Sequence, residues 1–181
     1  DSLFAMQAQT LSERITARRD SVGDRVARAI AITPKDGPYV WWCNLNSESE
    51  ALAKGIDGAV ETKGSDPDHI KEQKLIDFSE GRIRVLVTKP KVAGFGMNWQ
   101  HCHRTGFIGL NDSWEQFYQA VRRFYRFGQT KPVDVDIIAA ETEGATVANI
   151  KRKEADAERM ANAMVMHMAD ITSENVRGSV R

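Results

Sequence analysis

The sequence predicts an α/β fold, in which helices cover both faces of a parallel β-sheet. Short apolar runs of strand type alternate along the chain with segments whose apolar residues recur at helical spacing. This alternation is typical of parallel strands joined by crossover helices. The length, 181 residues, suits one such domain, or one domain with an appendage, and allows a buried core.

The N-terminal region, residues 1–33, is predicted to be a helical lead-in. Apolar residues recur at roughly helical spacing among charges from Thr10 to Ile32, and Gly23 inside this run leaves open one helix or two. The turn sequence TPKDGP, residues 33–38, ends the helical pattern.

The central region, residues 34–141, is predicted to contain the sheet. Cap residues and early acids open its first helix, and β-branched or aromatic residues fill its strands. The predicted strands are Tyr39–Cys43, Ala59–Thr62, Arg82–Thr88, Thr105–Leu110 and Val133–Ala140, and the predicted helices are Asn46–Gly55, Asp68–Phe78 and Ser113–Phe127.

The C-terminal region, residues 142–181, is predicted to be a helical extension that packs on this domain. A long helix is expected from Thr142 to about Asp170. Its apolar residues at helical spacing favour packing on the domain or on a missing partner over binding of a cofactor. These residues are Met160, Met164, Val165 and Met168.

Composition limits the classes of function. Lys and Arg total 25 and Asp and Glu total 25, so any contact with nucleic acid must come from a local basic patch. No apolar run approaches the length of a membrane span, and residues 1–19 do not resemble a signal peptide. Cys43 and Cys102 form no CxxC pair, which favours buried thiols in a reducing, cytoplasmic compartment. The chain begins with Asp rather than Met, and we expect it to be a piece of a longer protein.

The stretch QAVRRFYRFGQTK, residues 119–131, places three arginines on the last helix of the central region. At about 100° per residue, one side of this helix is apolar and aromatic. The other side carries a glutamine and three arginines: Gln119, Arg122, Arg123 and Arg126. Taken alone, this face is either a solvated surface or a phosphate-binding surface, because guanidinium groups bind phosphate through planar paired donors.

Four segments in order resemble superfamily-two helicases and translocases, and the Swi/Snf-type branch above all. Motif VI of that family is matched by Gln119, Arg123, Arg126, Gly128 and Gln129. The other three segments are Tyr39–Asn44, which resembles the motif IV strand, Glu72–Val87, which resembles the helix and strand before motif V, and Gly94–Asn98, which resembles motif V. A phage or prophage-like source is compatible with this resemblance. The resemblance implies a RecA-like parallel sheet flanked by helices, forming the C-terminal lobe of a two-lobed motor.

The resemblance also implies roles for individual residues at an ATP site between the two lobes. Arg126 would be the arginine finger and Arg123 a second phosphate contact, both stabilising charge on the transferred phosphoryl group. Gln119, Gly96 and Asn98 would complete the ATP-binding set of this lobe.

The nucleic-acid contacts are expected at loops that follow strands. The candidates are Lys63, Thr88, Lys89 and Lys91. Each loop has the alternative of an ordinary surface turn. The sequence departs from the family pattern at two positions. Pro90 stands where a hydroxyl residue is expected, which puts a direct contact by Thr88 in doubt. Arg122 stands at a commonly acidic position, which leaves its role open between exposed surface and nucleic-acid contact.

The partners follow from what the chain lacks. No G-x-x-x-x-G-K-[ST] loop and no Asp-Glu pair for magnesium is present. ATP with Mg²⁺ would therefore be bound mainly by the N-terminal lobe of the same full-length chain, and this chain alone is expected to be inactive. The expected track is DNA, with RNA not excluded.

Alternatives from other classes are a non-catalytic RecA-like binding module and a Rossmann-like transferase. The transferase is disfavoured because its glycine fingerprint should follow the first strand, whereas Gly94 and Gly96 follow the third. A metal site at His101 and His103 is disfavoured because alternating side chains on extended backbone diverge. No metal ligands are therefore assigned.

Overall fold

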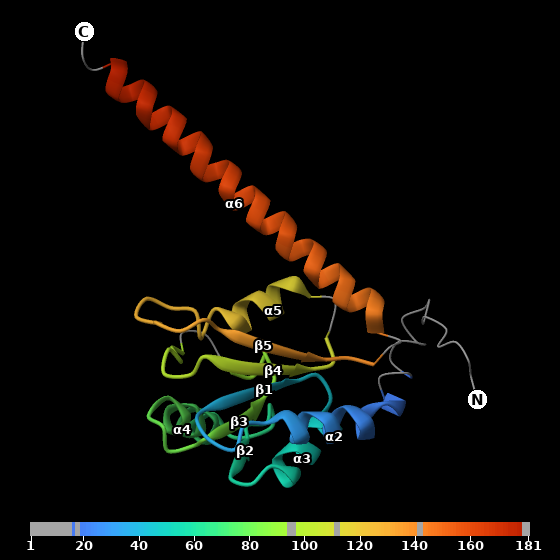
Figure 1. Ribbon diagram of the computed structural model, residues 1–181. Coiled ribbons are helices and arrows are strands. Elements are labelled where there is room, and N and C mark those ends of the chain that lie inside the picture. Colours follow the sequence, from blue (N-terminus) through green and yellow to red (C-terminus); the bar gives the residue numbers. More distant parts are fainter. Residues whose placement is uncertain (1–15, 17–18, 94–96, 111–112, 141–142, 179–181) are drawn as a thin grey trace.

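The computed structural model describes residues 16, 19–93, 97–110, 113–140 and 143–178. In the last of these ranges, side chains are described as far as Met160 and at Asn162. Figure 1 shows a central sheet with helices on both sides and one long C-terminal helix that projects away from it. The predicted α/β class and the parallel sheet covered on both faces are confirmed.

The sheet has five strands, all of them parallel. Their order is β2-β3-β1-β4-β5. The first strand, β1, lies in the centre, with β3 and then β2 on one side and β4 and then β5 on the other. The strands are β1 (Tyr39–Cys43), β2 (Ala59–Glu61), β3 (Val85–Thr88), β4 (Arg104–Ile108) and β5 (Asp134–Ile138). Because the strands are parallel, the loops that follow them meet at one edge of the sheet.

The helices divide between the two faces of the sheet. They are α2 (Val22–Ile32), α3 (Asn46–Gly55), α4 (Asp68–Ser79), α5 (Trp114–Val121) and α6 (Gly144–Gly178). One face packs against α2 and α3 and forms the first core with them. The other face packs against α4, α5 and the first turns of α6 and forms the second core. The strands and helices lie where the periodicity predicts them, with differences of a few residues at most ends; α5 and α6 are the main exceptions.

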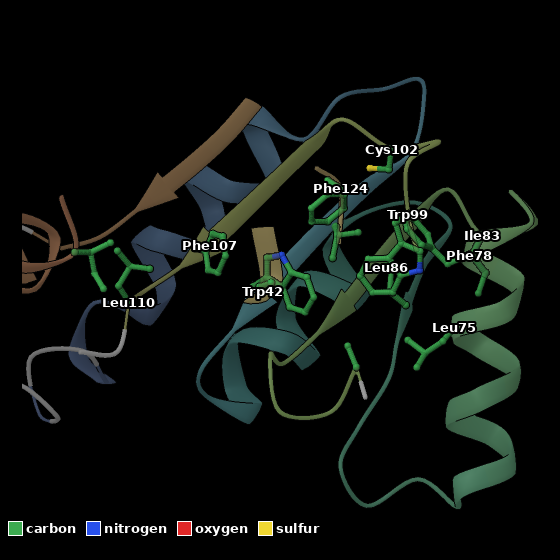
Figure 2. Packing of buried hydrophobic residues seen from close by; sticks show 14 residues of the cluster. Trp42, Leu75, Phe78, Ile83, Leu86, Trp99, Cys102, Phe107, Leu110 and Phe124 are labelled. Atoms are coloured by element: carbon green, nitrogen blue, oxygen red, sulfur yellow. The ribbon is translucent and has the colours of Figure 1, made fainter. Parts of the chain in front are cut away.

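Alternation along β1 supplies side chains to both cores. Tyr39, Trp41 and Cys43 point to the α2 and α3 face, while Val40 and Trp42 point to the opposite face. All five residues are at most 1% exposed, as expected for the central strand of a parallel sheet. Figure 2 shows the second core, in which the Trp42 ring lies between Phe107 of β4 and Leu86 of β3.

Tyr39 reaches across a neighbouring strand to the edge of the sheet. Its hydroxyl donates to Asp136 Oδ2 of β5 at 2.7 Å, and the strand between them, β4, has glycine at position 106. A Cβ at Gly106 would lie 2.6 Å from the Tyr39 hydroxyl and would also collide with the Trp41 ring. Gly106 therefore opens the path by which β1 is joined to β5.

A buried cluster of charges joins α2, α3 and the start of α6. Arg25 Nη1 lies 2.6 Å from Glu48 Oε1, and Arg25 Nε lies 3.9 Å from Glu143 Oε2. All three side chains are at most 3% exposed. The second Glu48 oxygen accepts from the N–H groups of Asn44 and Leu45, at 3.0 and 2.9 Å, so its charge is also stabilised by the backbone before α3.

The helix α6 is longer than predicted, and the buried residues among its described side chains lie in its first turns. Ile150 is 2% exposed, and Val147 packs beside it against the second core. Farther along, Met160 is 67% exposed, and Figure 1 shows the helix continuing away from the sheet. The side chains of Met164, Val165 and Met168 lie outside the described residues.

Within the described residues, no helix is long and apolar enough to cross a membrane. Among the residues that the structure describes, no group of three or more His, Cys, Asp and Glu side chains is placed to hold a metal ion. His101 instead lies against the Phe78 ring, with 5.1 Å between ring centres, and partial burial lowers the pKa of its imidazole. Both cysteines are buried free thiols.

Candidate functional site

The helix that carries the arginines ends earlier than predicted. α5 begins after Ser113, whose side chain accepts a hydrogen bond from the Gln116 N–H at 3.3 Å as an N-cap. It ends at Val121 rather than Phe127, and residues 122–124 form a turn. The prediction of one helix through all three arginines is therefore wrong.

A contact with the loop before β4 explains the early end. The carbonyl of Arg123 accepts a hydrogen bond from the Trp99 N–H at 2.9 Å. In a continuing helix that carbonyl would accept from the N–H of Phe127 instead. The turn also places the Phe124 ring, which is fully buried, in the second core beside Trp99, as Figure 2 shows.

The turn separates the arginines that the helical pattern grouped together. Arg123 is only 8% exposed, and its guanidinium carbon lies 5.6 Å from the centre of the Trp99 ring. Arg122 and Arg126 are exposed. The predicted single arginine face is thus corrected to one buried and two exposed guanidinium groups, and the cause is the shift of helical phase at residues 122–124.

Arg123 and Arg126 remain close enough to interact. Burial lowers the pKa of the Arg123 guanidinium, and the positive charge of Arg126 lowers it further. Two cations held near one another make this corner of the domain favourable for an anion. Gln119 lies on α5, about one helical turn before Arg123, and is exposed.

Gln129 fixes the backbone around Arg126. Its side-chain nitrogen Nε2 donates to the carbonyls of Gln100 (3.0 Å), Cys102 (3.1 Å) and Phe124 (3.3 Å). Its own N–H donates to the carbonyl of Arg126 at 2.9 Å. One side chain thereby ties the turn after α5 to the loop before β4 and closes the bend that presents Arg126.

Gly128 lies within the same bend, with a φ of 97° that disfavours any side chain. A Cβ there would also lie 3.0 Å from the side-chain oxygen of Gln100. Gly128 therefore closes the bend after Arg126 in a left-handed conformation and lies beyond the end of α5.

The last residue of the segment Gly94–Asn98 lies near this corner. Asn98 is exposed, one residue before Trp99, and its side-chain oxygen accepts from the Gln100 N–H at 3.3 Å. Asn98 therefore lies in the same loop that contacts the Arg123 turn. Gly96 lies outside the described residues.

The predicted lysines lie at the opposite edge of the sheet, where the strands end. Lys63 follows β2, and Lys89 and Lys91 follow the adjacent strand β3. Lys89 Nζ donates to Asn46 Oδ1 at the start of α3 (2.6 Å), and Lys91 is exposed. These loops share one edge because β2 and β3 are parallel neighbours.

Lys63 is partly exposed, and its charge is already paired within the domain. Its Nζ lies 2.9 Å from Glu50 Oε1 and 3.4 Å from Glu61 Oε2. The hydrogen bond with Glu50 is the main reason why the pKa of Lys63 is raised. A phosphate group would have to compete with both carboxylates for this ammonium group.

The structure does not support a contact between Thr88 and nucleic acid. Thr88 is fully buried, and its hydroxyl donates to the carbonyl of Thr62 at 3.4 Å. Its side chain joins the ends of β3 and β2 and does not face solvent. The position of Pro90 in the sequence had already put this contact in doubt.

The candidate residues therefore form two groups at opposite edges of the sheet. The lysines lie after the carboxyl ends of the strands, while Arg123, Arg126 and Asn98 lie near segments that precede β4. Residues 89–93 follow β3 at the first edge, and residues 97–103 precede β4 at the other. Sequence reasoning missed that Trp99 and Gln129 hold the second group together, although Gln129 is one of the residues that resemble motif VI.

Solved structures give an independent comparison of the fold. The C-terminal domain of the DEAD-box protein Dbp5 matches with a TM-score of 0.64 at 16% identity, covering 74% of this chain and 80% of that chain. The C-terminal part of the Fun30 ATPase domain matches with a TM-score of 0.53 at 17% identity, covering 71% of this chain and 41% of that chain. A Saccharomyces cerevisiae Dbp5 variant bound to Gle1 and IP6 matches with a TM-score of 0.63 at 15% identity, covering 77% of this chain and 37% of that chain.

No protein-family model matches the chain, and no curated protein matches it significantly in sequence. The likeness to the solved structures is therefore one of fold. It agrees with the five-stranded parallel sheet, its flanking helices and the order of the elements. The chain shares its RecA-like fold with the C-terminal domain of the DEAD-box protein Dbp5 and with the C-terminal part of the Fun30 ATPase domain.

Proposed function

We propose that this chain is the second motor lobe of an ATP-dependent DNA helicase or translocase, with Arg126 as its arginine finger. The observation that carries the proposal is the contrast between two neighbouring arginines. Arg126 is exposed on a bend whose backbone is fixed by Gln129, while Arg123 is buried over Trp99. An arginine finger must be accessible to a phosphate and held in place before the reaction, and the exposure of Arg126 and its fixed backbone support this role.

The rest of the site is proposed around that residue. Arg123 adds positive charge beside Arg126, and Gln119, Gly96 and Asn98 are the further residues of this lobe that would contact ATP. Lys63, Lys89 and Lys91 would contact the nucleic-acid backbone at the opposite edge of the sheet. ATP with Mg²⁺ would be bound mainly by an N-terminal lobe, because this sequence has no phosphate-binding Gly-Lys loop.

The test uses a protein in which this chain is joined to a lobe that carries the phosphate-binding loop. Arg126→Ala should lower DNA-stimulated kcat by about 10³-fold or more, because a finger acts when charge develops on the departing phosphoryl group. Arg126→Lys should restore little, since an ammonium group lacks the planar paired donors. Arg159→Ala, which removes an exposed arginine on α6, is the matched control and should retain the parent rate.

Parent-like hydrolysis by Arg126→Ala would remove the catalytic assignment and favour a non-catalytic RecA-like module. The same assay with single-stranded DNA, double-stranded DNA and RNA identifies the polymer that stimulates hydrolysis. The chain by itself should hydrolyse no ATP above background, and turnover on the order of 1 per second would contradict the proposal of a half-site.

A further inference from the structure

A groove of about 660 Å³ lies between α5 and α6. Figure 1 shows α6 crossing above α5 and then continuing away from the sheet. The groove is far larger than a packing defect and falls within the range of binding sites in proteins. Its two walls differ in chemistry, and this difference indicates what the groove can bind.

One wall is aromatic and comes from α5 and the turn after it. It includes Trp114, Phe117, Tyr118 and Tyr125. Trp114 and Tyr118 are stacked with 5.8 Å between ring centres. Tyr118 and Tyr125 are 41% and 70% exposed. Exposed aromatic side chains gathered along one groove are typical of a protein-binding surface.

The opposite wall, from α6, is acidic. Glu154 and Glu158 both line the groove and are exposed. Their i,i+4 spacing brings two like charges together, which is unfavourable in an isolated helix. Within the part of the chain that the structure describes, neither carboxylate forms a salt bridge.

Arg122, which also lines the groove, already contacts the aromatic wall. Arg122 Nη1 donates to the Tyr118 hydroxyl at 3.1 Å, and its guanidinium carbon lies 5.6 Å from the centre of that ring. The groove thus offers apolar rings on one side and two carboxylates without a cationic partner on the other.

We propose that this groove binds an amphipathic helix of a partner protein that carries lysine or arginine along one flank. The apolar side of such a helix would cover the rings, and its cations would approach Glu154 and Glu158 and the faces of the tyrosines. Charge complementarity selects this partner over nucleic acid, because the two carboxylates repel phosphate groups. The inference does not depend on the proposed motor function.

Tryptophan fluorescence of the chain itself can report on this groove. Trp41, Trp42 and Trp99 are at most 1% exposed, whereas Trp114 is only partly buried and lines the groove. The probe is a synthetic amphipathic peptide with leucine on one helical face and lysine on the other. Because the chain has no net charge, bulk attraction does not explain its binding. Titration should change the fluorescence in a saturable way.

Charge variants then test the acidic wall. The double variant Glu154→Lys/Glu158→Lys should weaken binding of the lysine peptide by about tenfold, and it should bind a peptide with glutamate in place of lysine better than the parent does. Asp156→Lys reverses one acidic charge, where the double variant reverses two, at an exposed position of α6 outside the groove, and should bind like the parent. Circular dichroism checks that helix content is unchanged.

Three outcomes would overturn the proposal. They are equal affinity of the parent and the double variant for the lysine peptide, an equal loss of affinity with Asp156→Lys, and equal binding of the lysine and glutamate peptides by the parent. A single-stranded DNA oligonucleotide that produced the Trp114 fluorescence change and was displaced by the lysine peptide would assign the groove to nucleic acid instead.

Discussion

Trp99 contacts Arg123 in two ways, through its ring and through its backbone. The ring centre lies 5.6 Å from the guanidinium carbon, and the Trp99 N–H donates to the Arg123 carbonyl at 2.9 Å. The indole N–H of Trp99 also donates to Ser79 Oγ at 3.0 Å, at the end of α4. The loop before β4 is thereby fixed both to α4 and to the turn after α5. The position of this turn, which carries Arg123, depends on that loop.

The first prediction concerns the stability that Trp99 provides. Trp99→Ala should lower the free energy of unfolding by about 3 to 5 kcal/mol, because a fully buried ring is lost from a packed core. Trp114→Ala, which truncates the partly buried tryptophan of α5, should cost less. Urea unfolding of the chain measures both values, and a Trp114→Ala variant less stable than Trp99→Ala would contradict the observed packing.

The second prediction concerns the buried pair of Arg25 and Glu48. Glu48→Gln removes the carboxylate that lies 2.6 Å from the buried Arg25 guanidinium, and should lower the free energy of unfolding by about 3 to 5 kcal/mol. Glu50→Gln is the matched control on the same helix. It breaks an exposed pair with Lys63 and should cost at most about 1 kcal/mol. Equal costs in thermal or urea unfolding would show that the buried cluster contributes no more than a surface pair.

The third prediction concerns the glycine between β1 and β5. Gly106→Ala should destabilise the domain by about 1 to 3 kcal/mol, because a methyl group would overlap the Tyr39 hydroxyl and the Trp41 ring. Gly23→Ala makes the same substitution in α2, where no atom lies within 4 Å of the added carbon. Helix propensity should make that variant more stable by up to about 1 kcal/mol. A Gly106→Ala variant as stable as the parent would contradict the close approach of the rings.

The fourth prediction concerns stability at high pH. Burial, with the hydrogen bond to Asp136 as the second cause, raises the pKa of Tyr39 above its ordinary value of 10.0. A pKa raised in the folded state gives stability that is fully present below the unfolded pKa and is lost as the pH rises above it. The free energy of unfolding should therefore fall above about pH 10, with a contribution from Tyr39 of about 1.4 kcal/mol per pH unit.

Tyr39→Phe provides the control for this pH dependence. It loses the bond to Asp136 at neutral pH, but its free energy of unfolding should fall less steeply above about pH 10, because no phenol ionises at that position. Urea unfolding of both proteins from about pH 8 to about pH 11 measures the two slopes. Identical slopes would show that Tyr39 ionises in the folded protein as readily as in the unfolded chain.

Periodicity alone predicted most elements because burial has the same signature in the sequence and in the fold. The run Tyr39–Cys43 is apolar throughout and forms the central strand, buried on both faces. Trp41, Trp42 and Trp99 are apolar in chemistry and are all buried in the core. Strand order was not predictable from periodicity, because it depends on crossover geometry and not on the pattern within any strand.

The sequence by itself determined the α/β class, the positions of the strands and the residue types available for binding phosphate, because these depend on local pattern and chemistry. Only the tertiary structure decided which of those residues are available. Arg123 is buried because its carbonyl accepts a hydrogen bond from Trp99 and its guanidinium lies over the Trp99 ring. Lys63 is paired because Glu50 and Glu61 lie beside it in the fold. Contacts between residues distant in sequence set the burial and pairing of each charge, and a local pattern carries no information about such contacts.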